Sequence, residues 1–102
     1  VKLDEVSVQD SYSSEQENYL VASLETASGN TYETIGDYIA EKKSHHRALT
    51  LTESRPDTAI KKRALACVYN NLANAYGNVG DVNTKIHYLE EAIRLNNALY
   101  DN

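Results

Sequence analysis

The sequence has little that would build anything other than helices. Of its 102 residues only four are glycine and one is proline, and phenylalanine, tryptophan and methionine are absent. Gly and Pro form the turns of β folds and interrupt helices, so their scarcity beside many Ala, Leu, Glu, Lys and Asn residues favours an all-α fold. A chain of this length has room for one domain.

Cysteine is nearly absent too, and long apolar runs are missing. The single Cys67 excludes an internal disulfide framework and a multi-thiolate zinc site. No apolar run approaches the roughly 20 residues that cross a bilayer, and nothing at the start has the pattern of a signal peptide. We expect a cytoplasmic protein without a membrane contact. Because the chain begins at Val1 rather than Met, we expect it to be a piece of a longer protein.

The charge balance narrows the classes of partner. Asp and Glu number 15 against 10 Lys and Arg, which gives a formal net charge of −5. Proteins hold nucleic-acid backbones and anionic membranes through clustered Lys and Arg, so neither partner is expected. The hydrophobic share of 41% is ordinary for a folded chain and argues against intrinsic disorder.

A capping box predicts the first helix. Glu17 follows Ser14 by three residues, a pattern in which each side chain bonds the backbone N–H of the other residue. We expect the helix to end near Gly36, and residues 1–13 to form a tail or a frayed lead-in, because they alternate weakly and carry no cap. Apolar and small residues then recur at helical spacing: Leu20, Leu24, Ala27, Thr31 and Ile35.

Turn signals predict three further helices. Gly36-Asp37 and Gly80-Asp81 each place a glycine before an aspartate that can cap the next helix. Pro56 lies between them and is tolerated only in the first turn of a helix. The expected helices cover about 37–52, 57–78 and 82–100.

The last two helices have the clearest apolar faces. One stripe follows the third helix: Leu65, Tyr69, Leu72, Tyr76 and Val79. The fourth helix has a wider face, suited to more than one neighbour, centred on Val82, Ile86, Leu89 and Ile93. Helices joined by short turns pack as antiparallel hairpins, here expected over about 14–54 and 55–102.

The two hairpins repeat each other in sequence. Residues 30 and 74 are both Asn, residues 32 and 76 are both Tyr, and the Gly-Asp turns begin at 36 and 80, a constant offset of 44 residues. The same offset pairs Ala48 with Ala92 and Leu49 with Ile93. Agreement at so many positions indicates a duplicated helical unit.

The second copy resembles a tetratricopeptide repeat (TPR). The resemblance rests on YNNLANAYGNVGD (Tyr69–Asp81) and HYLEEAIRL (His87–Leu95), which carry the aromatic, Leu, small and Tyr positions of that family. Repeats of this elongated type are similar to those of G-protein-signalling modulators, kinesin light chains and bacterial peptide-pheromone receptors. The resemblance implies a right-handed α-solenoid with about four helices in two repeats.

The first copy is the more degenerate one. Glu41 and His45 fall at positions that the family usually fills with a small and an aromatic residue. This is either the pattern of a worn or terminal repeat, or a sign that the second helix is shifted in register.

An asparagine stripe is the candidate binding site. Asn is a mediocre helix former, costing roughly 0.5 kcal/mol against Ala, so several on one helix face are not explained by helix stability. In TPR arrays this face lines a concave groove, which implies a peptide-binding set of Asn70, Asn74, Asn78, Asn71, Asn30, Thr26 and Thr34. The alternative is an uncharged solvated face.

The resemblance implies a non-catalytic protein- or peptide-binding module from a larger scaffold or adaptor. An amide donates and accepts hydrogen bonds as a peptide backbone does, which suits it to hold an extended segment. No cofactor and no metal are expected. A module that self-associates into a homo-oligomer through an exposed hairpin face is the alternative, since two repeats leave a face bare.

The remaining reactive side chains are interpreted as structural. Adjacent His45 and His46 point about 100° apart on a helix and cannot chelate one metal from it, and they and His87 lack a zinc motif. Cys67 is interpreted as a small buried or half-buried hydrophobe, with a groove-lining role as the alternative. The basic residues are interpreted as solvated helix faces, or as contacts to an acidic partner: Lys42, Lys43, Arg47, Lys61, Lys62 and Arg63.

Overall fold

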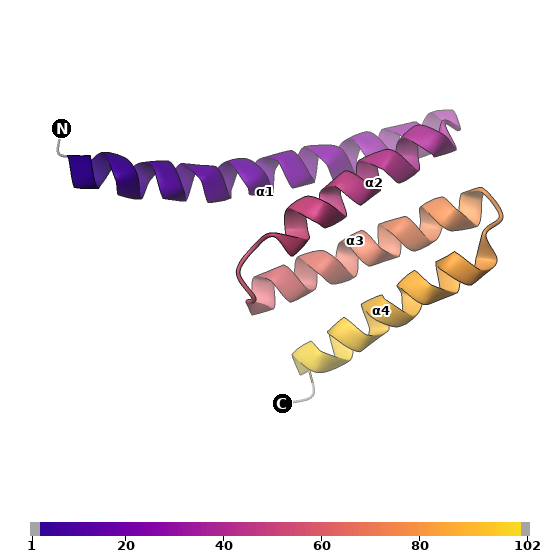
Figure 1. Cartoon of the computed structure of the whole chain (residues 1–102). Helices are drawn as coiled ribbons and strands as arrows, with labels where there is room; N and C mark the ends of the chain where they lie inside the picture. Colours follow the sequence, from indigo (N-terminus) through magenta and orange to yellow (C-terminus); the bar gives the residue numbers. More distant parts are fainter. Residues whose placement is uncertain (1–2, 101–102) are drawn as a thin grey trace.

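The computed structural model is all-helical over the part that it describes, namely the backbone of residues 3–100 and the side chains of residues 17, 18 and 20–100. Its helices are α1 (Leu3–Ile35), α2 (Tyr38–Glu53), α3 (Ala59–Asn78) and α4 (Val82–Tyr100). They form two antiparallel hairpins, α1 with α2 and α3 with α4, joined through α2 and α3 (Figure 1). The predicted all-α fold of helical hairpins is confirmed.

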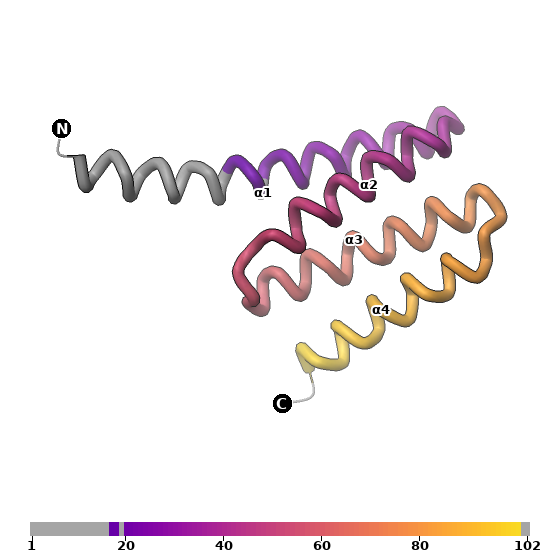
Figure 2. Tube along the Cα trace, viewed as in Figure 1, coloured from indigo at the N-terminus to yellow at the C-terminus, as the bar shows by residue number. Residues whose placement is uncertain are grey.

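The helices form an open row rather than a closed bundle. Each helix packs on its neighbour along the chain, and α1 makes only a few close backbone contacts with α3. Over the residues described, α4 makes no close backbone contact with α1 or α2, and Figure 2 shows the same order across the molecule. Helix α3 is therefore covered on two sides, whereas α1 and α4 have a close neighbour on one side only. None of the described helices combines the length and apolar composition that crossing a bilayer requires.

The turns of the two hairpins have the same geometry. Gly36 and Gly80 have φ angles of 80° and 82°, in the left-handed region that favours glycine. Asp37 and Asp81 each donate the backbone N–H, at 2.9 Å, to the carbonyl oxygen of the tyrosine five residues earlier. Each carboxylate accepts from the backbone N–H three residues further on, at 3.2 Å in the first hairpin and 3.1 Å in the second. Both predicted Gly-Asp turns are confirmed.

Helix α2 lies on α1 in the register in which α4 lies on α3. Glu33 and Glu41 meet across the first hairpin, where both accept from the amide of Asn78. The corresponding residues 44 positions later are Gly77 and Lys85, which are also in contact. The register shift considered for the second helix is absent.

Two helix boundaries differ from the predicted ones. Helix α1 begins at Leu3 rather than near Ser14, since no glycine or proline precedes Gly29 to interrupt it. The predicted capping box depends on the Ser14 side chain, which lies outside the described ones. Helix α3 begins at Ala59, two residues later than predicted, because Thr58 caps it by accepting from the N–H three residues on at 3.2 Å.

The core joins α2 to α3. Ala48, Val68 and Leu72 are buried together there. Leu49 and three tyrosines pack around them: Tyr69, Tyr76 and Tyr88. The packing of Tyr69 and Tyr76, expected from the apolar stripe of the third helix, is confirmed. Small residues let the paired helices approach closely, and four alanines at these crossings are buried: Ala22, Ala66, Ala73 and Ala92.

Two of the predicted apolar stripes face outward. On α4, Val82, Ile86 and Ile93 are exposed. On α1, Leu20 and Leu24 are exposed on the side that faces away from α2, and the rest of that stripe is exposed too: Ala27, Thr31 and Ile35. Both ends of the row therefore carry apolar surface that no described residue covers.

Candidate functional site

The predicted groove residues of α3 belong to its one exposed stripe. Because α3 packs between α2 and α4, the residues that stay exposed after its first turn recur every three or four positions: Arg63, Cys67, Asn70, Asn74 and Asn78. Asn70 and Asn74 make no side-chain hydrogen bond to another described residue. Their amides thus keep both a donor and an acceptor for a ligand.

The predicted counterparts on α1 lie on the matching stripe. Asn30 and Thr34 are exposed and Thr26 is half-buried. Both threonine hydroxyls donate at 3.1 Å to the carbonyl oxygen one turn earlier in the helix, and their oxygens can still accept. Asn71 of α3 is half-buried beside the exposed stripe.

A hollow of about 330 Å³ lies between α1, α3 and the end of α2, where Thr52 and Arg55 line it, and of the predicted groove residues only Thr26 reaches it. Its lining includes Ala22, Ser23 and Thr26 from α1 with Cys67 and Val68 from α3. The interpretation of Cys67 as a buried hydrophobe is wrong, since the residue is exposed. Position 67 falls on the outward stripe of α3, so the side chain lines this hollow instead of the core.

Asn78 is engaged within the protein. Its Nδ2 donates to Oε2 of Glu33 at 2.8 Å and to Oε1 of Glu41 at 3.1 Å, which ties α3 to both helices of the first hairpin. Burial raises the pKa of the Glu41 carboxyl, the bond from Asn78 acts to lower that pKa, and the nearby Glu33 raises it. Both N–H groups of Asn78 are used, so this member of the predicted set holds the hairpins together.

The histidines take different positions. His45 is buried, with Nε2 at 3.9 Å from Oε2 of Glu41 and with Nδ1 lacking a hydrogen-bond partner. His46 is half-buried, with Nε2 at 2.7 Å from the Tyr76 hydroxyl. Burial lowers the pKa of both imidazoles. His87 is exposed. Within the described part of the chain, no group of three or more His, Cys, Asp or Glu side chains is arranged to hold a metal ion.

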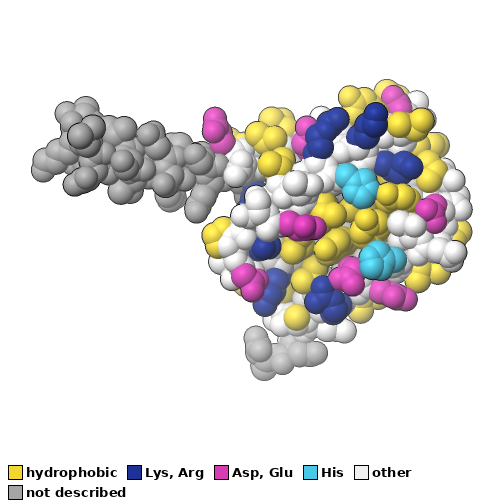
Figure 3. Space-filling model, viewed as in Figure 1, with side chains coloured by type: hydrophobic (Ala, Val, Ile, Leu, Met, Phe, Trp, Pro, Cys, Tyr) yellow, Lys and Arg dark blue, Asp and Glu magenta, His cyan; other side chains and the backbone are white. Residues whose placement is uncertain are grey.

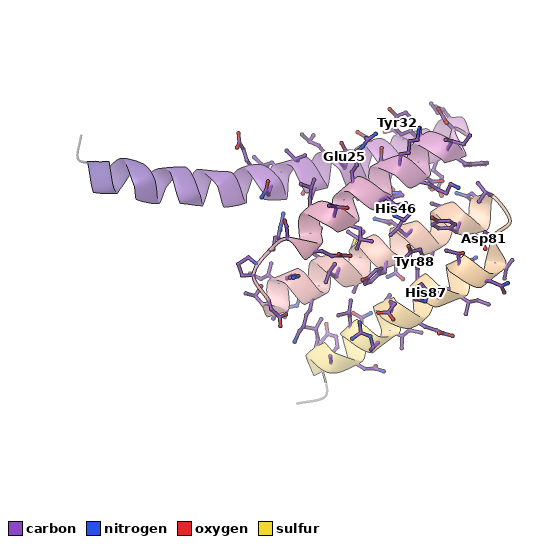
Figure 4. All side chains as sticks on the ribbon, in the orientation of Figure 1. Glu25, Tyr32, His46, Asp81, His87 and Tyr88 are labelled. Carbon is purple, nitrogen blue, oxygen red and sulfur yellow. The ribbon has the colours of Figure 1, made fainter. Side chains whose placement is uncertain are left out.

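The basic residues of α2 gather on the face drawn in Figure 3. Lys42, Lys43, Arg47 and Tyr76 line a shallow hollow of about 500 Å³. The Lys42 Nζ lies 5.2 Å from the centre of the Tyr76 ring, and Arg47 donates to Oε2 of Glu25 at 3.1 Å. Figure 4 shows Glu25 on α1, behind α2. Lys43 and Arg47 are exposed, as predicted for solvated faces.

Sequence reasoning missed this second hollow. The spacing of Tyr76 predicts only its packing on the core, and its half-buried ring also reaches the surface beside α2. The rings of His46 and Tyr88, labelled in Figure 4, lie 6.3 Å apart and connect α2 with α4. The signal that was available is the helical spacing of Lys42 and His46, which places both on one side of their helix.

No protein-family model, curated protein or solved structure matches the chain.

Proposed function

We propose that this chain is a non-catalytic peptide-binding module of the TPR type, part of a larger cytoplasmic scaffold or adaptor. Its ligand is an extended or helical protein segment that lies along the stripes of α1 and α3. The observation that carries the proposal is the pair Asn70 and Asn74, exposed, without other hydrogen bonds, and on the same stripe as the hollow-lining Cys67.

The chemistry of recognition follows from these side chains. Each amide can donate to a backbone carbonyl and accept from a backbone N–H, so Asn70 and Asn74 fix the ligand backbone. The hollow between Ala22 and Val68 accepts a small apolar side chain of the ligand. Affinity for a short peptide is modest, because ordering a flexible ligand offsets much of the contact energy.

A double substitution tests the proposal. Peptides selected from a random peptide library on the wild-type protein are measured by fluorescence anisotropy against Asn70→Ala combined with Asn74→Ala. We expect about tenfold weaker binding or more, since each lost pair of amide hydrogen bonds contributes on the order of 1 kcal/mol. Alanine is the better helix former, so the loss does not come from unfolding.

The matched control is Asn96→Ala combined with Asn97→Ala, two exposed asparagines on α4. This control is expected to change peptide affinity by less than about twofold, since it removes the same chemistry from another helix. Equal affinity of the selected peptides for the wild type and for the Asn70, Asn74 variant would show that the groove assignment is wrong.

A further inference from the structure

The contact between α2 and α3 shows how α1 and α4, the helices at the two ends of the row, can be covered. We call this contact the template. The sequence repeats at an offset of 44 residues, and both hairpins have the same turn geometry and register. Each residue of α2 therefore has a structural counterpart on α4, and each residue of α3 has one on α1. The template shows which faces of α4 and α1 would meet in an equivalent contact.

On α2, the face toward α3 includes Lys42, whose Nζ lies over the Tyr76 ring, and Leu49, which packs on the core. Their counterparts 44 positions later are Ile86 and Ile93 on α4. These two side chains are 47% and 58% exposed, which is high for isoleucine. The face that α2 buries under α3 is thus present on α4, with isoleucine in place of Lys42 and Glu90 in place of His46, and it has no cover among the described residues.

On α3, the face toward α2 includes Val68 and Leu72, which are buried with Ala48. The counterparts of these two residues on α1 are Leu24 and Ser28. Leu24 is 66% exposed, and Ser28 is exposed beside it. The face that α3 buries on α2 is therefore repeated on α1, again without a cover.

The opposite sides of these helices confirm the correspondence. Ala66 and Ala73 of α3 are buried, with relative exposures of 4% and 0%. Their counterparts on α1, Ala22 and Gly29, are buried too, so α1 sits on α2 in the same rotation as α3 sits on α4. The outward faces differ: those of α2 and α3 pack on each other, whereas those of α1 and α4 are uncovered.

We propose that a second copy of this chain covers these faces, so that α1 of one copy packs on α4 of the next as α3 packs on α2 within one copy. The two surfaces are different and complementary, which makes the contact head-to-tail and leaves a free α1 face at one end of each stack and a free α4 face at the other. The α1 stripe contains no charged residue: Leu20, Leu24, Ala27, Ser28, Thr31 and Ile35. The α4 face has the exposed Val82, Ile86 and Ile93 with one carboxylate, Glu90, the counterpart of the His46 that contacts Tyr76 in the template. The association is independent of peptide binding, because it uses other faces.

Two blocked variants test the proposal. Ile86→Lys with Ile93→Lys blocks the α4 face, and Leu20→Lys with Leu24→Lys blocks the α1 face; all four side chains are exposed in the single copy, so folding is retained. Analytical ultracentrifugation of the wild type is expected to give a mass that rises with concentration above 11.4 kDa. Each blocked variant alone is expected to associate at least tenfold more weakly.

Mixing the two blocked variants distinguishes head-to-tail contact from a symmetric one. Each retains one intact face, so the mixture is expected to form a one-to-one pair of twice the single-chain mass and to grow no further. Ile39→Lys with Ile60→Lys adds the same charge at exposed isoleucines outside both stripes and is expected to behave as the wild type. Circular dichroism checks folding, and Ser28→Arg supplies a second block of the α1 face if the leucine variant is unfolded.

Three results would overturn the proposal. The first is a wild type that stays at 11.4 kDa up to the highest soluble concentration, which would leave the faces to a helix of another protein or of a longer chain. The second is association in the wild type without pairing in the mixture, which would indicate a symmetric contact. The third is equal loss of association in the Ile39, Ile60 control.

Discussion

At the scale of single residues, Gly29 has a role that Ala73, its counterpart in the second hairpin, does not share. A Cβ atom at Gly29 would lie 2.5 Å from Cε1 of His45 and under 3.0 Å from both ring nitrogens. His45 is itself 1% exposed and has no room to withdraw. The crossing of α1 and α2 therefore depends on the absence of a side chain at this position.

We predict that Gly29→Ala destabilises the protein by about 1–3 kcal/mol, because the new methyl group overpacks a buried ring. The better helix propensity of alanine offsets only part of this cost. Urea unfolding followed by circular dichroism measures the change.

Gly77→Ala is the matched control on α3. A Cβ there would meet only the Lys85 side chain, with Cδ at 3.0 Å, and that flexible chain can move away. The control should leave stability unchanged or raise it by up to about 1 kcal/mol, since alanine favours the helix. A Gly29→Ala protein as stable as Gly77→Ala would mean that the His45 contact is not tight.

Residue roles were predictable from the sequence only where spacing decides them. The outward position of Asn70 and Asn74 follows from their offset against the apolar stripe of α3. The same geometry favours the alternative given for Cys67, a groove-lining role, over its interpretation as a buried hydrophobe, which rests on residue type. The bonds of Asn78 to Glu33 depend on how two hairpins meet, which no local pattern encodes.

At the scale of helices, a polar network joins α1, α2 and α3. Asn78 bonds both Glu33 and Glu41, and Glu41 lies near His45 in the interior. Burial raises the pKa of Glu41 above its ordinary value of 4.5 and lowers the pKa of His45 below its ordinary value of 6.5. As pH falls below 6.5, the unfolded chain binds a proton at His45 before the folded chain does, so this residue lowers stability in acid.

Glu41 acts in the opposite direction. The folded protein takes up its proton at a higher pH than the unfolded chain, so the cost of the buried carboxylate is present at neutral pH and is relieved as pH falls toward 4.5. We predict that Glu41→Gln is more stable than the wild type at pH 7, and that the difference shrinks toward pH 4.5. Because one group titrates, the difference in unfolding free energy between the two proteins cannot change by more than about 1.4 kcal/mol per pH unit. Urea unfolding at a series of pH values measures it.

Glu53→Gln is the control for this comparison, because it removes an exposed charge from the same helix. The stability difference between this variant and the wild type should change little over the same pH range. Parallel pH profiles of Glu41→Gln and the wild type would refute the assigned role of Glu41. His46 is present in both proteins, so its contribution cancels, whereas His45 lies 3.9 Å from the Glu41 carboxylate and its titration is part of what the substitution changes.

Helix boundaries were predictable where the chain carries a stop signal. Gly36 and Gly80 adopt the left-handed conformation that their type allows, and the turns formed where expected. The start of α1 was not predictable from the capping box at Ser14, because a capping pattern can also occur inside a helix that nothing interrupts. The sequence does not predict which face of α1 packs on α2, because the exposed stripe of α1 has the same helical spacing of apolar residues as a buried stripe.

At the scale of the whole molecule, most contacts join neighbouring helices. Helix α4 rests on α3, and side chains such as Tyr88 and His46 supply its link to α2. Stability is then approximately the sum of hairpin terms and of the term for the contact between hairpins. The charge of −5 and the two apolar end faces are properties of the whole row that no single helix reveals.

The identical turns at Gly36 and Gly80 have a consequence for how such a chain can lengthen. A gene segment encoding one 44-residue unit, copied in frame, would add a hairpin whose bend and rotation are already set by the copied turn. No new kind of junction would have to evolve, since the inserted unit would meet the old ones through surfaces that they already possess. Growth by tandem copying therefore needs no new contact in this architecture, and divergence can afterwards be confined to the exposed stripes of α1 and α3.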